Sequence, residues 1–191
     1  MNRKIIAATN NKGKLAELKK ILSSHSFAVL SLAEAGITAV PDETGTTFEE
    51  NARIKAREIF ALAKQTYAGG SPAVIADDSG LEVDFLGGEP GVYSANYDIP
   101  WLLEKLGNTP YEKRGARFVC CICYIDESGN EQFFHGTCEG TIGFESKGEN
   151  GFGYDPVFEI REGTTMAMLT DDEKNALSHR GNALRKFAEF I

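Results

Sequence analysis

The stretch from Ala73 to Ala95, A-V-I-A-D-D-S-G-L-E-V-D-F-L-G-G-E-P-G-V-Y-S-A, organises this chain. Its first four residues are apolar and lead directly into Asp77, Asp78, Ser79 and Gly80. An apolar run that stops at turn-forming residues indicates a buried strand. We therefore expect this strand to deliver two carboxylates and a hydroxyl to a loop at its C-terminal edge.

Two adjacent carboxylates at the end of an apolar strand repel each other and lose hydration. A bound cation, a strong set of donors or a raised pKa must compensate for this cost. Magnesium is the simplest cation, because it prefers oxygen ligands and shares its coordination between carboxylates and substrate phosphates. The alternative is purely structural: Asp77 and Asp78 form a turn and a helix cap, since Asp, Ser and Gly are ordinary turn residues.

Composition favours one domain that spans residues 1–191, with 42% hydrophobic and 25% charged residues. The apolar segments are shorter than the roughly 20 residues of a membrane span, and the N-terminus lacks a signal peptide's apolar core. We therefore expect a soluble, cytoplasmic protein. A net charge of −8 argues against nucleic-acid and membrane partners. It leaves small polyanions open, because local positive groups and a metal ion decide their binding.

Four cysteines occur, and three of them crowd one apparent strand, F-V-C-C-I-C-Y-I. We interpret Cys120, Cys121 and Cys123 as small buried thiols. A zinc site would need a second spaced pair, and only Cys138 is left for it.

A first strand is expected over residues 4–9, followed by the polar loop N-N-K-G-K and a helix. The apolar face of this helix consists of Leu15, Leu18, Ile21 and Leu22. A strand, a glycine-containing loop and a helix N-terminus together favour phosphate binding. Thr9, Asn11 and Lys14 are the candidates, and Lys12 adds positive charge. An ordinary strand-to-helix turn is the alternative, because the loop is no Walker A motif.

A second strand is expected near residues 27–32. Thr47 and Glu50 have capping-box spacing, which predicts a helix from there to about residue 66. Asn51 and Lys55 are four residues apart and share a helix face, and Glu43 lies just before the helix. These charged residues are either functional or no more than caps and solvated surface.

The next segments predict a tight loop at residues 87–91, a short helix at 100–106 and a polar connection at 107–114. A hairpin should pair residues 116–126 with 132–138, and its second strand should continue through residues 140–144.

The glycine-rich segment G-E-N-G-F-G-Y-D-P-V-F, residues 148–158, suits a mobile loop that presents Phe152 for stacking, or a plain turn into a strand. Thr170 and Glu173 again have capping-box spacing. The final helix should break near residues 178–181 and carry an apolar stripe of Leu177, Leu184, Phe187, Ala188 and Ile191. Lys174, His179 and Arg180 form a polar cluster, which is either a site or surface decoration.

Six motifs together closely resemble the Ham1 family of inosine and xanthosine triphosphate pyrophosphatases. They follow the family's order from Thr9 to Gly181, and they read T-N-N-K-G-K, E-T-G-T-T-F-E-E-N-A-R-I-K-A, A-D-D-S-G-L-E-V-D, G-E-P-G-V-Y-S-A, G-F-G-Y-D-P-V-F and E-K-N-A-L-S-H-R-G. The resemblance implies a mixed α/β fold with a long twisted central sheet flanked by helices. It also implies two lobes around a substrate cleft and a homodimer.

The implied reaction is magnesium-dependent hydrolysis of a noncanonical purine nucleoside triphosphate to the monophosphate and pyrophosphate. By position, the family's metal-associated acids match Glu43 and Asp78, and its catalytic base matches Asp78 with Asp77 close by. The remaining matches are substrate-binding residues. In the phosphate loop they are Thr9, Asn10, Asn11, Lys12, Gly13 and Lys14. Lys55 matches a position near the phosphates, and Ser79 matches a substrate contact. The nucleoside loop supplies Phe152, Gly153, Tyr154 and Asp155, and the base-recognition cluster supplies Lys174, His179 and Arg180.

Two other functions stay open. One is a related pyrophosphatase that prefers modified pyrimidine triphosphates, and the other is a nucleotide-binding sensor without turnover. The cluster around His179 favours a purine, and the intact acids argue against a sensor. The chain also departs from the family at Y-D-I-P-W-L, residues 97–102, where members often carry a longer segment before the short helix.

Overall fold

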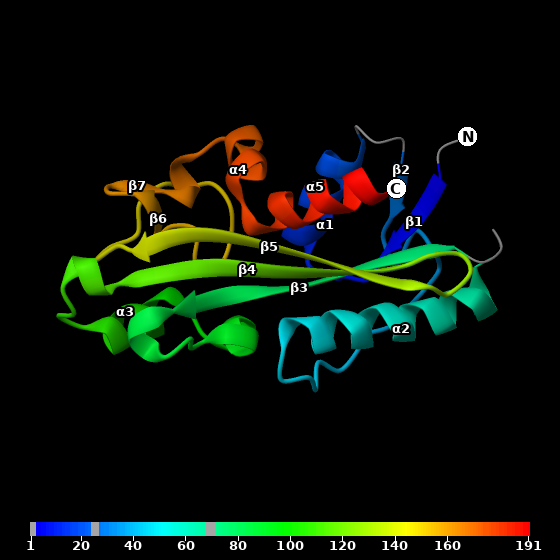
Figure 1. The fold of residues 1–191 in the computed structure, drawn as a ribbon, viewed down its shortest axis with the longest axis horizontal. Helices are drawn as coiled ribbons and strands as arrows, with labels where there is room; N and C mark the ends of the chain where they lie inside the picture. The colour runs from blue at the N-terminus through cyan, green and yellow to red at the C-terminus, as the bar shows by residue number, and fades with distance from the viewer. Residues whose placement is uncertain (1–2, 24–26, 68–71) are drawn as a thin grey trace. The chain divides into compact units, whose positions relative to one another are not determined.

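The computed structural model describes residues 3–23, 27–67 and 72–191. In these ranges, seven strands form one mixed sheet in the order β2-β1-β3-β4-β5-β6-β7 (Figure 1). β1 runs parallel to β2 and β3, whereas β6 runs antiparallel to β5 and β7. The strands are β1 (Arg3–Ala7), β2 (Phe27–Leu30), β3 (Ala73–Val83), β4 (Gly115–Ile125), β5 (Glu131–Ile142), β6 (Phe158–Arg161) and β7 (Thr164–Thr165). The expected mixed sheet flanked by helices is confirmed.

The helices also follow the expected segments. They are α1 (Lys12–Ser23), α2 (Phe48–Thr66), α3 (Ile99–Leu106), α4 (Asp171–Leu177) and α5 (His179–Phe190), with short 3-10 helices η1 (Asp84–Leu86), η2 (Gly91–Asn96), η3 (Tyr111–Lys113) and η4 (Met166–Met168). Both predicted capping boxes are present: Thr47 with Glu50 opens α2, and Thr170 with Glu173 opens α4. Hydroxyl and carboxylate thus satisfy backbone donors that the first turn leaves unpaired.

The chain divides into two compact units. The first comprises Met1–Asp78, Cys121–His135 and Ala183–Ile191, and the second comprises Ser79–Cys120 and Gly136–Asn182. The division falls inside β3, between the second carboxylate and the serine of the acidic motif.

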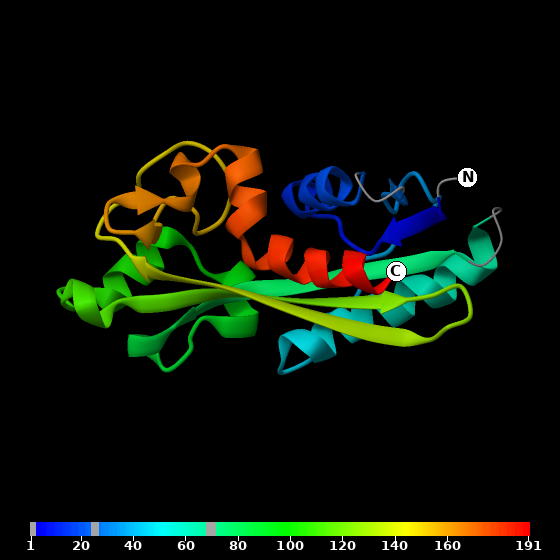
Figure 2. The same cartoon turned by 45° about the horizontal axis from the view of Figure 1, so that its top comes forward.

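In the first unit, α2 covers one face of the strands, and α1 and α5 cover the other (Figures 1 and 2). The buried side chains of α2 recur at helical spacing, as Ala52, Ala56, Ile59 and Ala63 show. On the other face, Phe187 of α5 contacts the rings of Phe27, Tyr124 and Phe134, with centroids 6.0, 4.9 and 5.5 Å apart. Apolar burial on both faces of the sheet therefore stabilises this unit.

The expected end of β3 at the acidic motif is wrong. The strand continues through Asp77 and Asp78 to Val83, and Leu81 and Val83 are fully buried. Apolar residues beyond the acids keep the segment in the sheet. The carboxylates are tolerated inside the strand because lysines from two helices pair with them, as described below.

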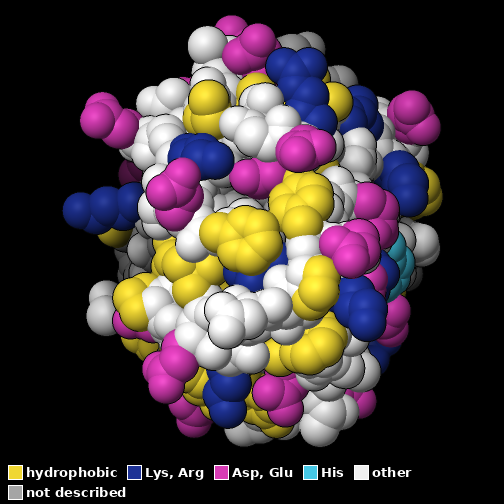
Figure 3. All heavy atoms as spheres, turned by 90° about the vertical axis from the view of Figure 1, so that its left-hand side faces the viewer, with side chains coloured by type: hydrophobic (Ala, Val, Ile, Leu, Met, Phe, Trp, Pro, Cys, Tyr) yellow, Lys and Arg dark blue, Asp and Glu magenta, His cyan; other side chains and the backbone are white. Residues whose placement is uncertain are grey.

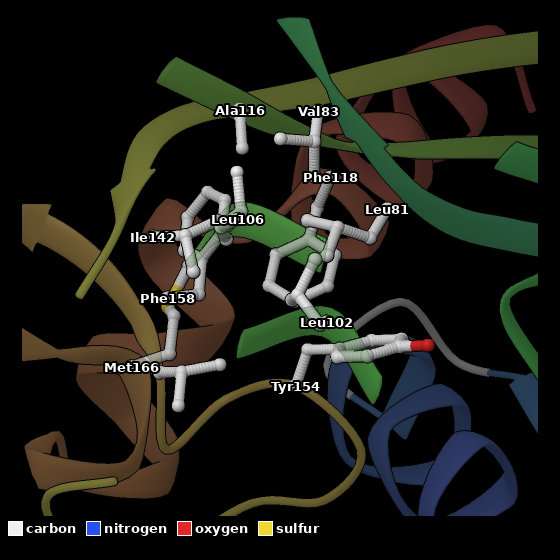
Figure 4. Packing of buried hydrophobic residues seen from close by; sticks show 11 residues of the cluster. Leu81, Val83, Leu102, Leu106, Ala116, Phe118, Ile142, Tyr154, Phe158 and Met166 are labelled. Carbon is white, nitrogen blue, oxygen red and sulfur yellow. The ribbon is translucent and has the colours of Figure 1, made fainter. Parts of the chain in front are cut away.

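The second unit has its own apolar core, which joins β3, α3, β4 and β6 (Figure 4). Its aromatic centre is formed by Phe118 and Phe158, with ring centroids 4.3 Å apart. Figure 4 shows the Tyr154 ring at the edge of this cluster with its hydroxyl pointing away. That hydroxyl lies 3.0 and 2.9 Å from the carbonyl oxygens of Ser94 and Tyr97, to which it donates. Hydrogen bonds of Tyr154 thus connect the glycine-rich segment to η2 and to the residue that follows it.

The short segment before α3 is well ordered by local contacts. Asp98 caps the helix, because its Oδ1 accepts a hydrogen bond from the Trp101 amide at 2.9 Å. The rings of Tyr97 and Trp101 stack with their centroids 4.1 Å apart. A compact stacked turn thus stands where we expected a departure from the family.

The predicted break in the last helix is confirmed at Ser178, which separates α4 from α5. The Ser178 hydroxyl accepts a hydrogen bond from the Gly181 amide at 3.1 Å and so caps α5. The predicted stripe is only partly correct. Leu184 and Phe187 are buried, but Leu177 and Ile191 lie at helix or chain ends, 49% and 39% exposed.

The cysteine prediction is confirmed for the three thiols of β4. Cys120, Cys121 and Cys123 are buried, and burial raises the pKa of Cys121 and of Cys123 to about 12. Such thiols stay protonated and unreactive. Among the described residues, no helix is long and apolar enough to cross a membrane.

A buried arginine that sequence patterns did not single out stabilises the second unit. Arg114, 1% exposed, donates to the carbonyl oxygens of Ile142, Gly143 and Gly107 at 2.8, 3.0 and 3.2 Å. It links the end of α3 to the end of β5.

We predict that Arg114→Leu lowers the free energy of unfolding by about 2–4 kcal/mol, because buried carbonyl oxygens lose their donor. Urea denaturation measures this change. Arg117→Leu is the control. Arg117 lies in β4, just after Arg114, and its loss should cost less than about 1 kcal/mol, because the Arg117 ion pairs are solvent-exposed. Equal losses in both variants would contradict this role of Arg114.

Candidate active site

Two lysines from different helices neutralise the acidic pair of β3. In the first unit, Lys14 Nζ of α1 lies 2.8 Å from Asp77 Oδ1, and Lys55 Nζ of α2 lies 2.7 Å from Asp78 Oδ1. The side chain of Asp77 is fully buried, and those of Asp78 and Lys55 are almost so. Adjacent side chains of a strand point to opposite faces, and α1 and α2 cover opposite faces (Figure 2). Each carboxylate therefore meets a lysine from its own side of the sheet.

Lys55 also brings Glu43 into this cluster. Its ammonium lies 2.9 Å from Glu43 Oε1, so one lysine contacts both acids that sequence motifs associate with a metal. Glu43 comes from the loop before α2, and its side chain is 44% exposed. An exposed carboxylate next to a buried acid can reach a solvent-borne ligand without a large cost of desolvation.

Burial sets the protonation of this cluster. It raises the pKa of the Asp78 carboxyl above its ordinary value, and the nearby positive charges of Lys55 and Lys14 oppose the shift. Burial alone would lower the pKa of Lys55, but the charges of Asp78, Asp77 and Glu43 raise it above its ordinary value. Lys55 therefore stays positively charged at neutral pH.

One oxygen of Asp78 remains available to a cation. Oδ2 is buried and accepts no hydrogen bond from the residues in ranges 3–23, 27–67 and 72–191, whereas Oδ1 is engaged by Lys55. The same ranges hold no group of three or more His, Cys, Asp or Glu side chains arranged to bind a metal. Magnesium needs only one or two carboxylates, because waters and phosphate oxygens complete its shell. Asp78 and Glu43 fit that requirement.

The loop between β1 and α1 has a structural role as well as the predicted one. Thr9 Oγ1 accepts a hydrogen bond from the Asn11 amide, and Asn11 Oδ1 accepts one from the Lys14 amide, both at 3.1 Å. Asn11 thus caps α1. Asn10 donates to the Ala39 carbonyl at 3.0 Å, and Lys12 and Gly13 begin the helix. Phosphate binding by this loop stays a prediction.

A second cluster surrounds Phe152 in the second unit. Asp155 Oδ2 accepts hydrogen bonds from the Lys174 ammonium at 2.6 Å and from the Phe152 amide at 2.8 Å. Lys174 Nζ lies 4.5 Å from the centroid of the Phe152 ring, which is 37% exposed. Lys174 and Asp155 are buried. The ion pair therefore fixes a cation next to a ring that solvent-borne groups can reach.

Arg180 and His179 extend this cluster from the first turn of α5. Arg180 is buried, its Nη2 donates to Ser79 Oγ at 2.9 Å, and its Cζ lies 5.8 Å from the Phe152 centroid. The His179 ring stacks on Phe118 with centroids 4.8 Å apart and an interplanar angle of 21°. These residues are buried and paired, so the interpretation as surface decoration is wrong.

The structure does not bring every predicted residue to these clusters. Tyr154 belongs to the apolar core, and the hydrogen bonds described for its hydroxyl go to backbone carbonyls of η2 and its end. Gly153 is exposed in the loop, with a positive φ of 62°. A direct contact of Tyr154 or Gly153 with a nucleoside stays a prediction.

Two supporting residues were not predicted as part of the site. Gly151 has a φ of 76°, and a Cβ at this position would collide with Asp155 Oδ2. Asn51 is buried, and its Oδ1 accepts a hydrogen bond from the Gly45 amide at 2.8 Å. The four-residue spacing of Asn51 and Lys55 was the only sequence signal for the second, and none marked Gly151 among its neighbouring glycines.

Comparison with known proteins identifies the class to which this fold and these clusters belong. The model of the Ham1 family matches residues 5–190. The chain therefore belongs to the Ham1 family.

Curated relatives are similar in sequence to this chain over nearly its whole length. A dITP/XTP pyrophosphatase of Exiguobacterium sibiricum is 48% identical, covering 96% of this chain and 94% of the relative. A protein of the same name from Bacillus subtilis is 44% identical, covering 99% and 97%.

Solved structures of similar proteins share the fold of this chain over nearly its whole length. The Staphylococcus aureus Ham1 protein has a TM-score of 0.82 and 40% identity, covering 98% of this chain and 97% of its own. The nucleoside-triphosphatase or dITP/XTP pyrophosphatase of Mycobacterium abscessus has a TM-score of 0.72 and 41% identity, covering 96% and 97%.

Proposed function

We propose that this chain hydrolyses noncanonical purine nucleoside triphosphates, namely ITP, dITP and XTP, to the nucleoside monophosphate and pyrophosphate. Relatives at 44% and 48% identity over nearly full length are named dITP/XTP pyrophosphatases. The observation that carries the proposal is the pair of buried lysine–aspartate contacts, Lys14 with Asp77 and Lys55 with Asp78. They support the proposal, because a triphosphate needs positive groups as partners and an attacking water needs a negative one. Such an activity would remove these nucleotides before their incorporation into DNA or RNA.

Magnesium is the proposed cofactor, and Glu43 and Asp78 are the residues that would hold it. This assignment is supported by Asp78 Oδ2, which accepts no hydrogen bond from the described part of the chain, and by the half-exposed Glu43 carboxylate. When bound, magnesium would neutralise negative charge on the phosphate oxygens of the substrate.

The protein's own residues supply the remaining chemistry. Lys14 and Lys55 balance the charge of the departing pyrophosphate, and their contacts with the acids hold them in position. Asp78 orients the attacking water or accepts its proton, and Asp77 shares this work. The raised pKa of Asp78 brings its basicity closer to that of an effective general base.

Selectivity for the base is assigned to the second cluster. Lys174, His179 and Arg180 carry donors that match the 6-keto oxygen of hypoxanthine or xanthine, whereas adenine presents an amino donor there. Donors that face donors in a buried pocket cost about 1–3 kcal/mol each, so several such contacts discriminate strongly. Phe152 adds stacking with any purine and hence little selectivity.

The proposal extends to assembly and location. We propose a homodimer in the cytoplasm. Exposed apolar residues support a homodimer, and in the second unit they include Phe85, Tyr93, Tyr97 and Phe144. Hydrophobic side chains gather on the face shown in Figure 3, among acidic and basic ones. Exposed apolar patches of this kind mark contact surfaces.

A substrate panel tests the proposed function. Pyrophosphate release should be fast with ITP, dITP and XTP, and at least about 10²-fold slower, in kcat/KM, with ATP and with modified pyrimidine triphosphates. A preference for the pyrimidines would establish the related pyrophosphatase instead. Tight binding of ITP without any hydrolysis would establish a sensor.

Gly151→Ala tests the support of the Phe152 cluster. The new methyl group would displace the Asp155 carboxylate and strain the positive φ. We predict that KM for dITP rises about 10-fold with kcat changed less than about 3-fold, because binding and not the reacting centre is affected. Gly163→Ala is the control, since its φ of 76° imposes the same strain but its Cβ meets no atom within 4 Å, and Gly163 is not a predicted binding residue. An equal rise of KM in both variants would contradict the role of Asp155.

A further inference from the structure

We infer that Asn51 is the positioning residue for Glu43, and that it acts through the backbone of the loop before α2. The inference rests on the proposed function only in that Glu43 is assigned to magnesium. Asn51 lies on α2, 2% exposed, one helical turn before Lys55. Its side-chain oxygen accepts a hydrogen bond from the Gly45 amide, two residues after Glu43.

The first turn of α2 holds three consecutive amides of this loop. Asn51 Oδ1 accepts from Gly45 at 2.8 Å, and Glu50 Oε2 accepts from Thr46 at 2.7 Å and from Thr47 at 3.2 Å. Glu50 also accepts from the Thr46 hydroxyl at 3.0 Å. An ordinary capping box holds only the amide of the capping residue, so this loop is held two residues further upstream.

The loop approaches the helix as closely as backbone permits. A Cβ at Gly45 would lie 2.6 Å from Glu50 Cβ and 2.7 Å from Asn51 Oδ1. Only glycine allows this approach, because real Cβ contacts are longer. The direction in which the chain leaves toward Glu43 is therefore determined at Gly45. Asn51 is the buried residue that holds the Gly45 amide in this place.

Glu43 depends on this loop more than a buried residue would. Its side chain is 44% exposed, and the contact described for it in this structure is with Lys55. Asn51 and Lys55 share one helix face, since they are four residues apart. A single helix thus fixes both the backbone of the Glu43 loop and the ammonium that meets the Glu43 carboxylate.

Loss of the Asn51 acceptor should therefore loosen Glu43 while leaving Asp78 and Lys55 in place. In Asn51→Ala, the magnesium concentration for half-maximal pyrophosphate release from dITP should rise about 10-fold or more, as for other residues that orient metal ligands. The kcat at saturating magnesium should stay within about 3-fold of the unchanged protein. Asn51→Asp keeps an oxygen acceptor and should restore most of the magnesium response.

Two further readouts do not require turnover. Binding of Mn²⁺, followed by the electron paramagnetic resonance signal of the free ion, should weaken by a similar factor in Asn51→Ala. A glutamate-specific protease should cut after Glu43 at least about 5-fold faster, because cleavage follows local opening of the loop. Cleavage after other glutamates should be unchanged.

Ile59→Val, further along the same helix, is the control for a general loss of stability, since Ile59 is buried and lies outside the loop contact. An Asn51→Ala protein with unchanged Mn²⁺ binding and unchanged cleavage after Glu43 would overturn the inference. So would an Ile59→Val protein with the same changes. If the unchanged protein releases no pyrophosphate, the proposed function fails, but Mn²⁺ binding and cleavage still decide the role of Asn51.

Discussion

Asp78→Asn is expected to reduce kcat for dITP by at least about 10³-fold, with little change in the stability of the fold. Asp78 is the one carboxylate that contacts Lys55 and also keeps a buried oxygen without a hydrogen bond among the described residues. The asparagine retains the shape but removes the charge that a cation and a water proton require. Because burial raises the pKa of Asp78, its charged form is disfavoured in the fold, and the neutral amide should be tolerated while the Lys55 ammonium keeps its contact with Glu43.

Steady-state kinetics at saturating magnesium and thermal unfolding measure the two halves of this prediction. Glu82→Gln is the matched control. Glu82 is a half-buried carboxylate four residues further along β3, and it also pairs with a basic residue, Arg117. It should keep kcat within about 2-fold. Retention of more than a tenth of the activity by a folded Asp78→Asn protein would contradict the assignment of Asp78.

Lys174→Gln is expected to abolish most of the preference for keto purines. The kcat/KM for dITP should fall about 10²-fold, and that for dATP should change less than about 3-fold. Lys174 provides a positive donor fixed by Asp155 at 2.6 Å and located 4.5 Å from the Phe152 centroid. Glutamine can still donate to Asp155, but it removes the charge and shortens the reach of the side chain.

A buried Asp155 with a weakened partner could itself disturb the loop, so the double variant Lys174→Gln with Asp155→Asn is measured in parallel. It removes the buried negative charge together with its positive partner. Both variants should lose the same preference between dITP and dATP. Equal losses of kcat/KM for the two substrates would show that Lys174 supports the loop and does not read the base.

Local sequence patterns predicted most of the fold. Capping boxes at Thr47 and Thr170, helical apolar spacing and the alternation of the hairpin all depend on neighbours within one turn or one strand, so they are visible without tertiary contacts. β3 is the exception. Turn-forming residues at its centre indicated a loop, but burial of Leu81 and Val83 and pairing with lysines keep the acids inside the strand.

Site residues were predicted by motif, but their partners were not. Lys14 and Lys55 were assigned to phosphates, whereas the structure pairs them with Asp77 and Asp78, residues 63 and 23 positions away. Such pairs form only when helices pack on the sheet, and no spacing rule reports them. Arg114 was missed for the same reason, because its acceptors are backbone carbonyls that any residue supplies.

The most direct test of the proposed function is pyrophosphate release from dITP and dATP, measured side by side with and without magnesium. We predict that release from dITP requires magnesium and that its kcat/KM is at least about 10²-fold higher than for dATP. Equal turnover of dATP would contradict base recognition by the Phe152 cluster. No release from dITP at any magnesium concentration would contradict the proposed function itself.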